Sequence, residues 1–283
     1  GYAFFSKAWK EMEFHCVKLE EVCRQKDAEF LGILNDIKYG RNLQNVIAYL
    51  ESNQSSDLME EAPYLVGTNA KADKINQAHM RALDEKTEKK FWAIIEGDVT
   101  YEDIKNISFA KQSLVVNIGA KVMLTANDTN GEYVNGTMGT IIDISKERGD
   151  ATCIQVLTDK GKKVDVYRYE REIERQDIEE SKEKDKNGET VIVKKIVRKI
   201  VGSFKQFPIK IAWAMSIHKS QGQTFGQVNI DPRCWDSGQF YVAVSRAESV
   251  AGIHFMDLIR KQYIRTLSDE VIKILKESLY SII

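Results

Sequence analysis

Long apolar runs, a secretory signal peptide and paired cysteines are all missing from this chain of 283 residues. Because no run reaches about 18 apolar residues, the sequence predicts no membrane-spanning helix and no membrane partner. The 4 cysteines include no CxxC pair and have no histidine pair beside them, which argues against a zinc site. Free thiols in a reducing compartment fit best. We therefore expect an intracellular protein, cytoplasmic if its source is bacterial, that holds no metal of its own.

Net charge is almost absent as well. The 41 Lys and Arg residues balance 42 Asp and Glu residues, which leaves −1 at pH 7. Bulk charge therefore does not predict nucleic-acid binding, although a basic groove on a neutral surface remains compatible with this balance. The apolar content of 43% and charged content of 29% are those of an ordinary globular protein, and the length allows one large or two modest domains.

A phosphate-binding loop of the form GxxxxGK followed by Ser or Thr is also missing. No Gly-Lys pair precedes a hydroxyl residue, and Gly161-Lys162-Lys163 comes nearest. The pair Asp84-Glu85 superficially resembles the acidic pair of an ATPase, but it follows a predicted helix rather than a buried strand. We therefore expect this chain alone to have no ATPase activity.

The most informative stretch that is present is Ile211–Phe225, IAWAMSIHKSQGQTF. Its first seven residues are apolar except for Ser216, which predicts a buried strand or the opening of a buried helix. The polar residues at 218–222 then combine an imidazole, an ammonium, a hydroxyl and a glycine. Such a group can surround a phosphate, because donors come from several directions and glycine lets backbone N–H groups approach closely. A solvated helix C-cap explains this segment equally well.

A second motif, Gly238–Ala247 (GQFYVAVSRA), decides between these interpretations. It ends an apolar run in Arg246, and the planar guanidinium suits bidentate contact with phosphate. Together, SIHKSQGQTF and GQFYVAVSRA resemble the last two motifs of the superfamily 1 DNA helicases, in particular the RecD-like branch that contains the petite-integration-frequency helicases. In that branch QFP…AW runs straight into the histidine motif, as Gln206-Phe207-Pro208 and Ala212-Trp213 do here. The resemblance covers most of the chain.

The resemblance implies an α/β fold: a RecA-like motor domain of the P-loop-NTPase type, lacking its own P-loop, with an inserted Src-homology-3-like β-barrel. Residues 1–113 and 208–283 would form the second, discontinuous motor domain, and residues 114–207 the barrel. The chain opens as though cut from something longer, so we expect the C-terminal motor portion of an ATP-dependent 5′-to-3′ DNA helicase. An N-terminal motor domain of the same polypeptide would bind most of the ATP and Mg²⁺. The implied partners are single-stranded DNA and duplex/single-strand junctions, with roles in DNA repair, recombination and telomere maintenance.

The resemblance also implies roles for individual residues. Two arginines would contact the γ-phosphate across the nucleotide cleft: Arg24 and Arg246. The neighbouring ATP contacts would come from Gln25, Gln221, Gly222 and Thr224. The phosphates of the single strand would be held by Thr68, Asn69, Ser216, His218 and Lys219. Two positions depart from relatives: Cys23 stands where an aromatic residue is usual, and Thr224 where helicases outside this branch carry glutamate.

Local patterns predict several elements. Asp27 should cap a helix that ends near Gly40, and a buried strand at 63–69 should lead into a helix at 70–83. An acidic arm at 170–183 and a basic arm around 194–199 should pair through a turn at Asn187-Gly188. A capped helix should begin at Ser268. The lysines of the basic arm could form cross-strand ion pairs or, alternatively, a phosphate-contacting edge.

Two interpretations from other classes stay open. The chain could be a stand-alone nucleic-acid-binding module that uses its barrel, or a protein-interaction domain whose barrel recruits a partner. Strong DNA binding by residues 114–207 alone would favour the first. Failure of every DNA contact would favour the second.

Overall fold

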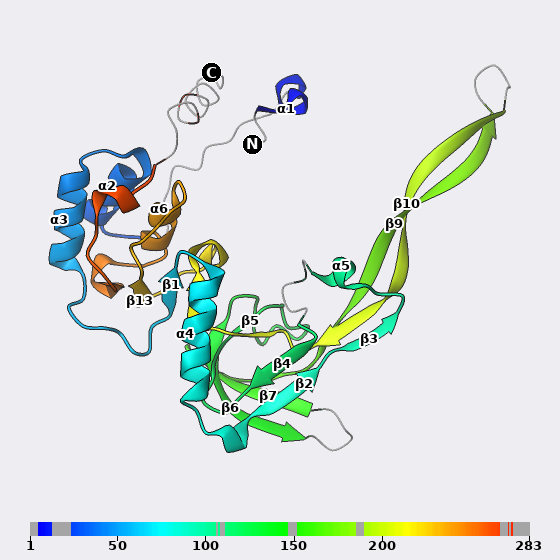
Figure 1. The fold of residues 1–283 in the computed structure, drawn as a ribbon, viewed down its shortest axis with the longest axis horizontal. Coiled ribbons are helices and arrows are strands. Elements are labelled where there is room, and N and C mark those ends of the chain that lie inside the picture. Colours follow the sequence, from blue (N-terminus) through cyan, green and yellow to red (C-terminus); the bar gives the residue numbers. More distant parts are fainter. Residues whose placement is uncertain are drawn as a thin grey trace. The chain divides into compact units, whose positions relative to one another are not determined.

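The computed structural model describes residues 5–12, 24–105, 107, 111–146, 152–184, 190–266, 271 and 273. Two compact units make up the chain: unit 1 comprises residues 1–72 and 215–283, and unit 2 comprises residues 73–214 (Figure 1). Thr68, Ser216 and Arg246 all belong to unit 1. Unit 2 is wider than the insert expected at 114–207, and the assignment of a motor domain and an insert remains a prediction.

Unit 1 combines helices with a four-stranded sheet of order β12-β1-β13-β14. Its helices and 3-10 turns are α1 (Lys7–Glu11), α2 (Ala28–Tyr39), α3 (Leu43–Asn53), the first turn of α4 (Asn69–Arg81), η3 (Ile217–Ser220), α6 (Gln239–Val244), η4 (Val250–Gly252) and η5 (Lys261–Tyr263). Its strands are β1 (Tyr64–Val66), β12 (Ala214–Ser216), β13 (Val228–Ile230) and β14 (Ile253–Phe255). Strands β1 and β14 both run parallel to β13. Their carboxyl ends therefore share one edge of the sheet, where ligand sites of α/β proteins form.

Helix α2 forms where the sequence predicts it. The Asp27 carboxylate accepts hydrogen bonds from the N–H groups of Glu29 and Phe30 at 2.8 and 3.2 Å, which satisfies two free donors of the first turn. Gly40 ends the helix with a φ of 68°, and a β-carbon there would collide with Thr266. The predicted helix bounds are therefore confirmed, and the helix packs against α3 and α6.

The sheet of unit 1 is buried, and one polar side chain inside it is fully satisfied. The Asn229 side chain, on β13, donates to the carbonyls of Met59 and Ala62 at 2.8 and 3.2 Å and accepts from the Met59 N–H at 3.2 Å. Burying an amide without hydrogen-bond partners costs free energy, and here every partner is present. These hydrogen bonds hold the connector before β1 against the sheet. The rings of Phe240 and Phe255 stack nearby, with centroids 6.0 Å apart.

Unit 2 is mainly antiparallel β structure. Besides the rest of α4 it contains η2 (Glu85–Thr87), α5 (Tyr101–Ile104), β2 (Lys89–Trp92), β3 (Ile94–Gly97), β4 (Ser113–Val116), β5 (Lys121–Leu124), β6 (Met138–Lys146), β7 (Thr152–Thr158), β8 (Lys163–Val166), β9 (Tyr169–Lys184), β10 (Thr190–Gln206) and β11 (Ile209–Ile211). Five strands form a sheet of order β11-β5-β6-β7-β8. In the part of the chain that the structure describes, the edge strands β11 and β8 do not pair, so these strands do not close into the predicted barrel.

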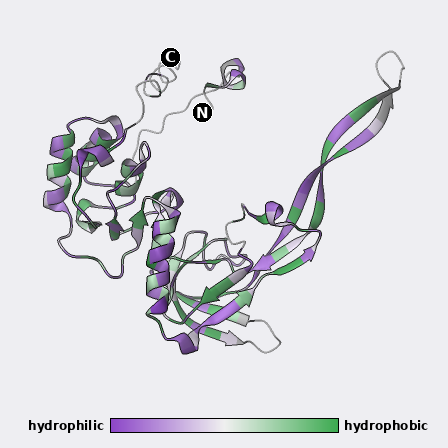
Figure 2. Ribbon diagram, viewed as in Figure 1, coloured by the Kyte–Doolittle hydropathy of each residue, from purple (hydrophilic) through white to green (hydrophobic). Residues whose placement is uncertain are grey.

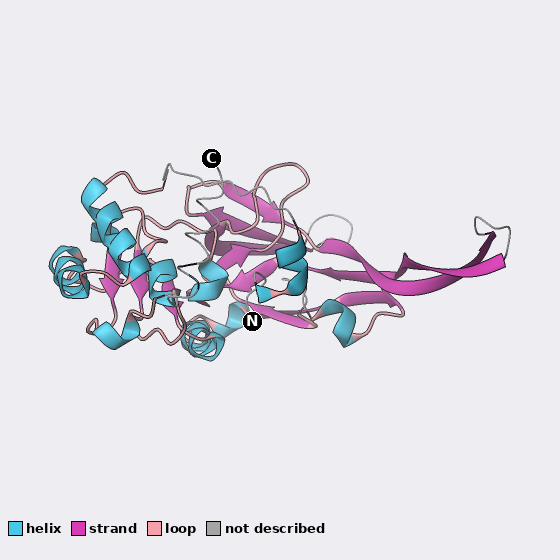
Figure 3. Cartoon of the chain, turned by 90° about the horizontal axis from the view of Figure 1, so that it is seen from above, coloured by secondary structure: helices cyan, strands magenta, loops and turns pink. Residues whose placement is uncertain are grey.

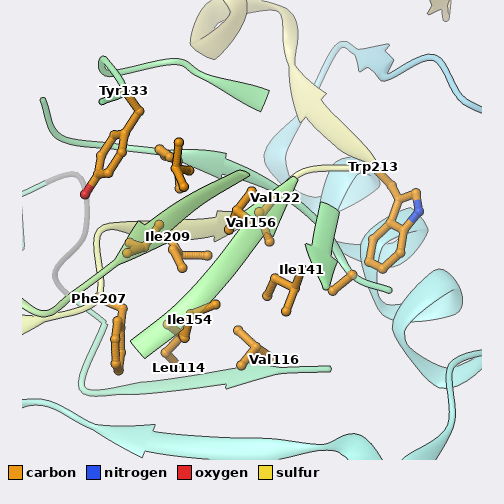
Figure 4. Packing of buried hydrophobic residues seen from close by; sticks show 14 residues of the cluster. Leu114, Val116, Val122, Tyr133, Ile141, Ile154, Val156, Phe207, Ile209 and Trp213 are labelled. Atoms are coloured by element: carbon orange, nitrogen blue, oxygen red, sulfur yellow. The ribbon is translucent and has the colours of Figure 1, made fainter. Parts of the chain in front are cut away.

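One apolar core underlies this sheet (Figure 4). Val122, Ile141 and Val156 project into it from β5, β6 and β7, and Phe207 joins them from the segment after β10. Gln206 fixes that segment, because its buried amide donates to the carbonyl of Phe91 at 3.1 Å and accepts from the Phe207 N–H at 3.0 Å. The Gln-Phe-Pro motif thus has a structural role at the end of β10.

Strands β9 and β10 form a long twisted ribbon that extends beyond the rest of unit 2 (Figures 1 and 3). Short hydrophilic and hydrophobic stretches follow one another along it (Figure 2). Lys194 pairs with Glu180 at 2.9 Å and Lys199 with Asp177 at 2.8 Å, which confirms the expected cross-strand ion pairs. The predicted turn at Asn187-Gly188 and nearly all of the predicted helix from Ser268 lie outside the described residues.

The stretch 211–217 is neither one strand nor the start of a helix. It is divided between β11 and β12, with a break at Ala212-Trp213. The Asn76 side chain causes this break, because its amide accepts from the Ala214 N–H and donates to the Ala214 carbonyl, both at 2.8 Å. A side chain from α4 therefore takes the place of a neighbouring strand at this point.

Candidate nucleotide and nucleic-acid site

The two predicted phosphate-contacting arginines come together in unit 1. Arg24, just before α2, donates from Nε to the Thr224 hydroxyl at 2.8 Å and from Nη1 to the Ser245 carbonyl at 3.1 Å. Arg246 follows Ser245, and burial together with the nearby charge of Arg24 lowers its pKa. Within the described ranges, neither guanidinium forms an ion pair with a carboxylate. Two adjacent cations that lack an anion make a site for a strongly charged anion such as phosphate.

The backbone around Arg246 is fixed on both sides. The Gln25 amide nitrogen donates to the carbonyls of Ser245 and Ala247 at 3.0 and 2.8 Å. Phe225, just after the predicted nucleotide turn, donates its N–H to the Arg246 carbonyl at 2.9 Å. Gln25 is only 3% exposed, so its amide nitrogen serves the protein backbone. The geometry therefore makes Gln25 a residue that positions Arg246, a role that sequence spacing alone did not indicate.

The Arg246 side chain is itself held by the protein. Its guanidinium donates to the Val242 carbonyl at 3.0 Å, the Gln223 carbonyl at 3.4 Å and the Ser245 hydroxyl at 3.0 Å. These acceptors are neutral, so they orient the guanidinium without cancelling its charge. A preoriented cation stabilises developing negative charge with little rearrangement.

The remaining predicted nucleotide residues form an exposed turn. Gln221 and Gly222 follow η3, and Gly222 has a φ of 87° with open space around its Cα. The left-handed conformation, rather than crowding, is what favours glycine here. The hydroxyl of Thr224 accepts the hydrogen bond from Arg24 and so links this turn to the arginine pair.

The residues predicted to hold DNA phosphates gather at the carboxyl edge of the unit 1 sheet. Thr68 and Asn69 follow β1, whereas His218 and Lys219 lie in η3, which packs against β1. All four are exposed. Ser216 differs, because it ends β12 and is only 4% exposed, so its hydroxyl would reach a phosphate only after local rearrangement.

An ionic cluster around the buried Asp231 carboxylate, at the same edge, was not predicted from the sequence. Asp231, directly after β13, contacts Lys71 Nζ in the first turn of α4 and accepts from Arg233 Nε at 3.1 Å. Burial alone would raise the pKa of Asp231, but hydrogen bonds from Lys71 and Arg233 outweigh it and lower this pKa. The cluster fixes the start of α4 against β13, beside Thr68. The sequence feature that could have indicated this cluster is an aspartate directly after a buried strand.

Two classes of site are not found in the described part of the chain. No group of three or more His, Cys, Asp or Glu side chains there could hold a metal ion. No helix among the described residues is both long and apolar enough to span a bilayer.

Known proteins share both the sequence and the fold of this chain, although no family model matches it. The ATP-dependent DNA helicase Pif1 of Bdellovibrio bacteriovorus is 31% identical over 258 residues, which cover 90% of this chain and 53% of that protein. The human ATP-dependent DNA helicase PIF1 is 27% identical over 260 residues, covering 90% of this chain and 37% of that protein.

Solved structures of Bacteroides Pif1 superpose on most of this chain. The complex with ADP-AlF4 has a TM-score of 0.72 at 26% identity and covers 95% of this chain and 57% of the Bacteroides chain. The complex with single-stranded DNA has a TM-score of 0.66 at 26% identity over the same share of each chain. The fold is therefore RecA-like α/β, and the chain spans about half the length of the bacterial relative it matches. In both sequence and fold, this chain is therefore similar to the Pif1 helicases over most of its length.

Proposed function

We propose that this chain is the C-terminal motor portion of an ATP-dependent 5′-to-3′ DNA helicase. The observation that carries this proposal is the pair Arg24 and Arg246, oriented by neutral acceptors and without an anionic partner among the described residues. The similar proteins are named ATP-dependent DNA helicases, and the Bacteroides relative has been solved with ADP-AlF4 and with single-stranded DNA.

The arginine pair fits the triphosphate of ATP. Bound ATP would supply the phosphoryl group for transfer to water. Arg24 and Arg246 would stabilise the negative charge that spreads over the γ-phosphate oxygens. Gln25 would keep the Arg246 backbone in place, and the turn at 221–224 would adjoin the nucleotide. Mg²⁺ would be held mainly by the motor domain that carries the phosphate loop.

The sheet edge of unit 1 fits the backbone of single-stranded DNA. Thr68, Asn69, His218 and Lys219 present hydroxyl, amide, imidazole and ammonium groups, which contact phosphates without reading sequence. Ser216 would take part only if η3 shifts. The proposed DNA-binding residues and the arginine pair lie on the same unit. Closure of the two motor domains on ATP would therefore move these DNA-binding residues together with the bound strand.

We propose that residues 114–207 act as a Src-homology-3-like insert in the second motor domain, which would be formed by residues 1–113 and 208–283. The support is the antiparallel order β5-β6-β7-β8 within these bounds, with the predicted motor residues before and after it in the sequence. Lys194 and Lys199 of the β9–β10 ribbon are paired with carboxylates, which argues against these two lysines as a phosphate-binding edge.

The isolated 283-residue chain is expected to show no ATPase activity above background, because it lacks a phosphate-binding loop. Phosphate release is measured with and without single-stranded DNA. Turnover near the enzyme median of about 10 per second would contradict the proposal. The complete protein, assayed in parallel, should hydrolyse ATP.

His218→Ala and Lys219→Ala, each made in the complete protein, should weaken single-strand binding about equally for oligonucleotides of different sequence, because phosphates carry no base information. Fluorescence anisotropy titrations with several labelled homopolymers measure this. Lys86→Ala removes an exposed lysine from η2 in unit 2 and is the matched control. A marked change in base preference would refute the phosphate assignment, and unchanged binding would favour a protein-interaction module instead.

A further inference from the structure

Trp235 is a large aromatic residue that is 54% exposed and yet tightly held. Its indole Nε1 donates to the Gly67 carbonyl at 3.1 Å, and its backbone N–H donates to the Gln239 side chain at 3.0 Å. Gln239 is 2% exposed and donates from its amide to the same Gly67 carbonyl at 3.1 Å. The buried side chain of Gln239 therefore binds both the Gly67 carbonyl, just after β1, and the Trp235 backbone, and so fixes their relative position.

The indole lies beside the residues proposed to hold DNA. Gly67 precedes Thr68, and a β-carbon at position 67 would lie 3.4 Å from the indole Cδ1. That distance is an ordinary van der Waals contact, so the indole lies directly against the backbone at Gly67. On its other flank the ring centroid of Trp235 is 6.5 Å from that of His218, with the planes tilted by 57°.

A structural role explains only part of this arrangement. The hydrogen bond from the indole N–H fixes the ring to Gly67, but more than half of the residue still faces solvent. An exposed indole loses the free energy that burial would give, whereas a fixed indole loses little further conformational entropy on binding. Aromatic faces of this kind stack on nucleobases without preference for sequence.

Charges of both signs lie near Trp235, and the Arg265 guanidinium donates to its backbone carbonyl at 2.7 Å. Asp236 follows Trp235, and its carboxylate lies 3.5 Å from Nε2 of His218. The indole itself is uncharged, so its exposed surface suits a base, whereas the DNA phosphates suit the neighbouring His218 and Lys219. We propose that Trp235 is a stacking platform for one base of the bound single strand, a role that rests on the proposed function, with Gln239 as its positioning residue.

The test measures binding of the complete protein to a thymidine oligonucleotide and to an oligonucleotide of equal length whose sugars lack bases. Trp235→Ala should weaken binding of the thymidine oligonucleotide by roughly 5- to 150-fold, the range expected for loss of one base–aromatic stack. The same variant should bind the abasic strand as the wild type does. Trp235→Phe, which keeps an aromatic face, should stay within a few fold of wild type on both strands.

Controls separate stacking from folding. Trp235→Leu keeps an apolar side chain without an aromatic face, so it should weaken binding like alanine while the melting temperature stays near that of Trp235→Phe. Trp92→Ala removes another exposed tryptophan, from β2 in unit 2, and should leave binding unchanged. Equal losses on the thymidine and abasic strands, or full binding by the alanine and leucine variants, would overturn the proposal.

The same titrations distinguish this proposal from the proposed function. Weaker binding by Lys219→Ala with full binding by Trp235→Ala would remove the stacking role and leave the phosphate track standing. No binding of any strand by the wild-type protein would remove both.

Discussion

Replacement of Arg246 by alanine in the complete protein is expected to lower kcat for ATP hydrolysis by roughly 10³-fold or more, as loss of an arginine finger does. The guanidinium matters most while charge on the γ-phosphate is being redistributed, and little when DNA merely binds. Single-strand affinity without nucleotide should therefore stay within a few fold of wild type. Steady-state ATPase assays and anisotropy titrations on the same preparation measure the two quantities.

The hydrogen bonds of Arg246 also allow a purely structural role, because its guanidinium binds the Val242 and Gln223 carbonyls. In that case its loss would lower the melting temperature and depress both activities together. Arg246→Lys decides between the two roles. It should rescue kcat poorly, because an ammonium keeps the charge but loses the planar fork.

Arg24→Ala should resemble Arg246→Ala, and Arg41→Ala, at the end of α2, is the matched control. Parallel loss of ATPase, DNA binding and stability would reject the finger assignment.

Replacement of Asp231 by alanine is expected to lower the free energy of unfolding by about 2–3 kcal/mol. This is below the roughly 3–5 kcal/mol lost when a fully buried ion pair is broken, because Lys71 and Arg233 retain partial access to water. The substitution should also remove the contact that joins Lys71, at the start of α4, to the end of β13. Chemical denaturation of the chain at neutral pH measures the change. Asp98→Ala, at an exposed carboxylate in unit 2, is the matched surface control.

The contribution of Asp231 to the free energy of unfolding is expected to depend on pH. The folded-state pKa of Asp231 is lowered, so its ionised form stabilises the fold above the unfolded-state pKa, about 3.9 for aspartate. That stabilisation disappears as the pH falls through the folded-state pKa. The difference in unfolding free energy between wild type and Asp231→Asn should thus be full at neutral pH and shrink below about pH 4. A difference that is constant between pH 7 and pH 3 would show that shape, rather than charge, is responsible.

Local chemistry in the sequence determined the elements whose signals are local. Asp27 and Gly40 mark the two ends of α2 because a capping carboxylate and a left-handed glycine act on the adjacent backbone. The Asn187-Gly188 pair predicted the β9–β10 pairing, and the opposite charges of the two arms add cross-strand ion pairs to it. The ordered motifs from 206 to 247 were sufficient to indicate the resemblance to the Pif1 helicases.

Only the tertiary structure decided which distant groups meet. Arg24 donates to the Ser245 carbonyl, which lies 221 positions away in the sequence, and Gln25 donates to the carbonyls on both sides of Arg246. The fold therefore brings Arg24 and Arg246 together and fixes the backbone around Arg246. Asp231 finds Lys71 across 160 positions. Asn76 divides the apolar stretch at 211–217 because its amide reaches Ala214 from another element. Periodicity and capping report on neighbours in the chain, whereas these contacts depend on how separate elements pack, and no local pattern encodes that packing.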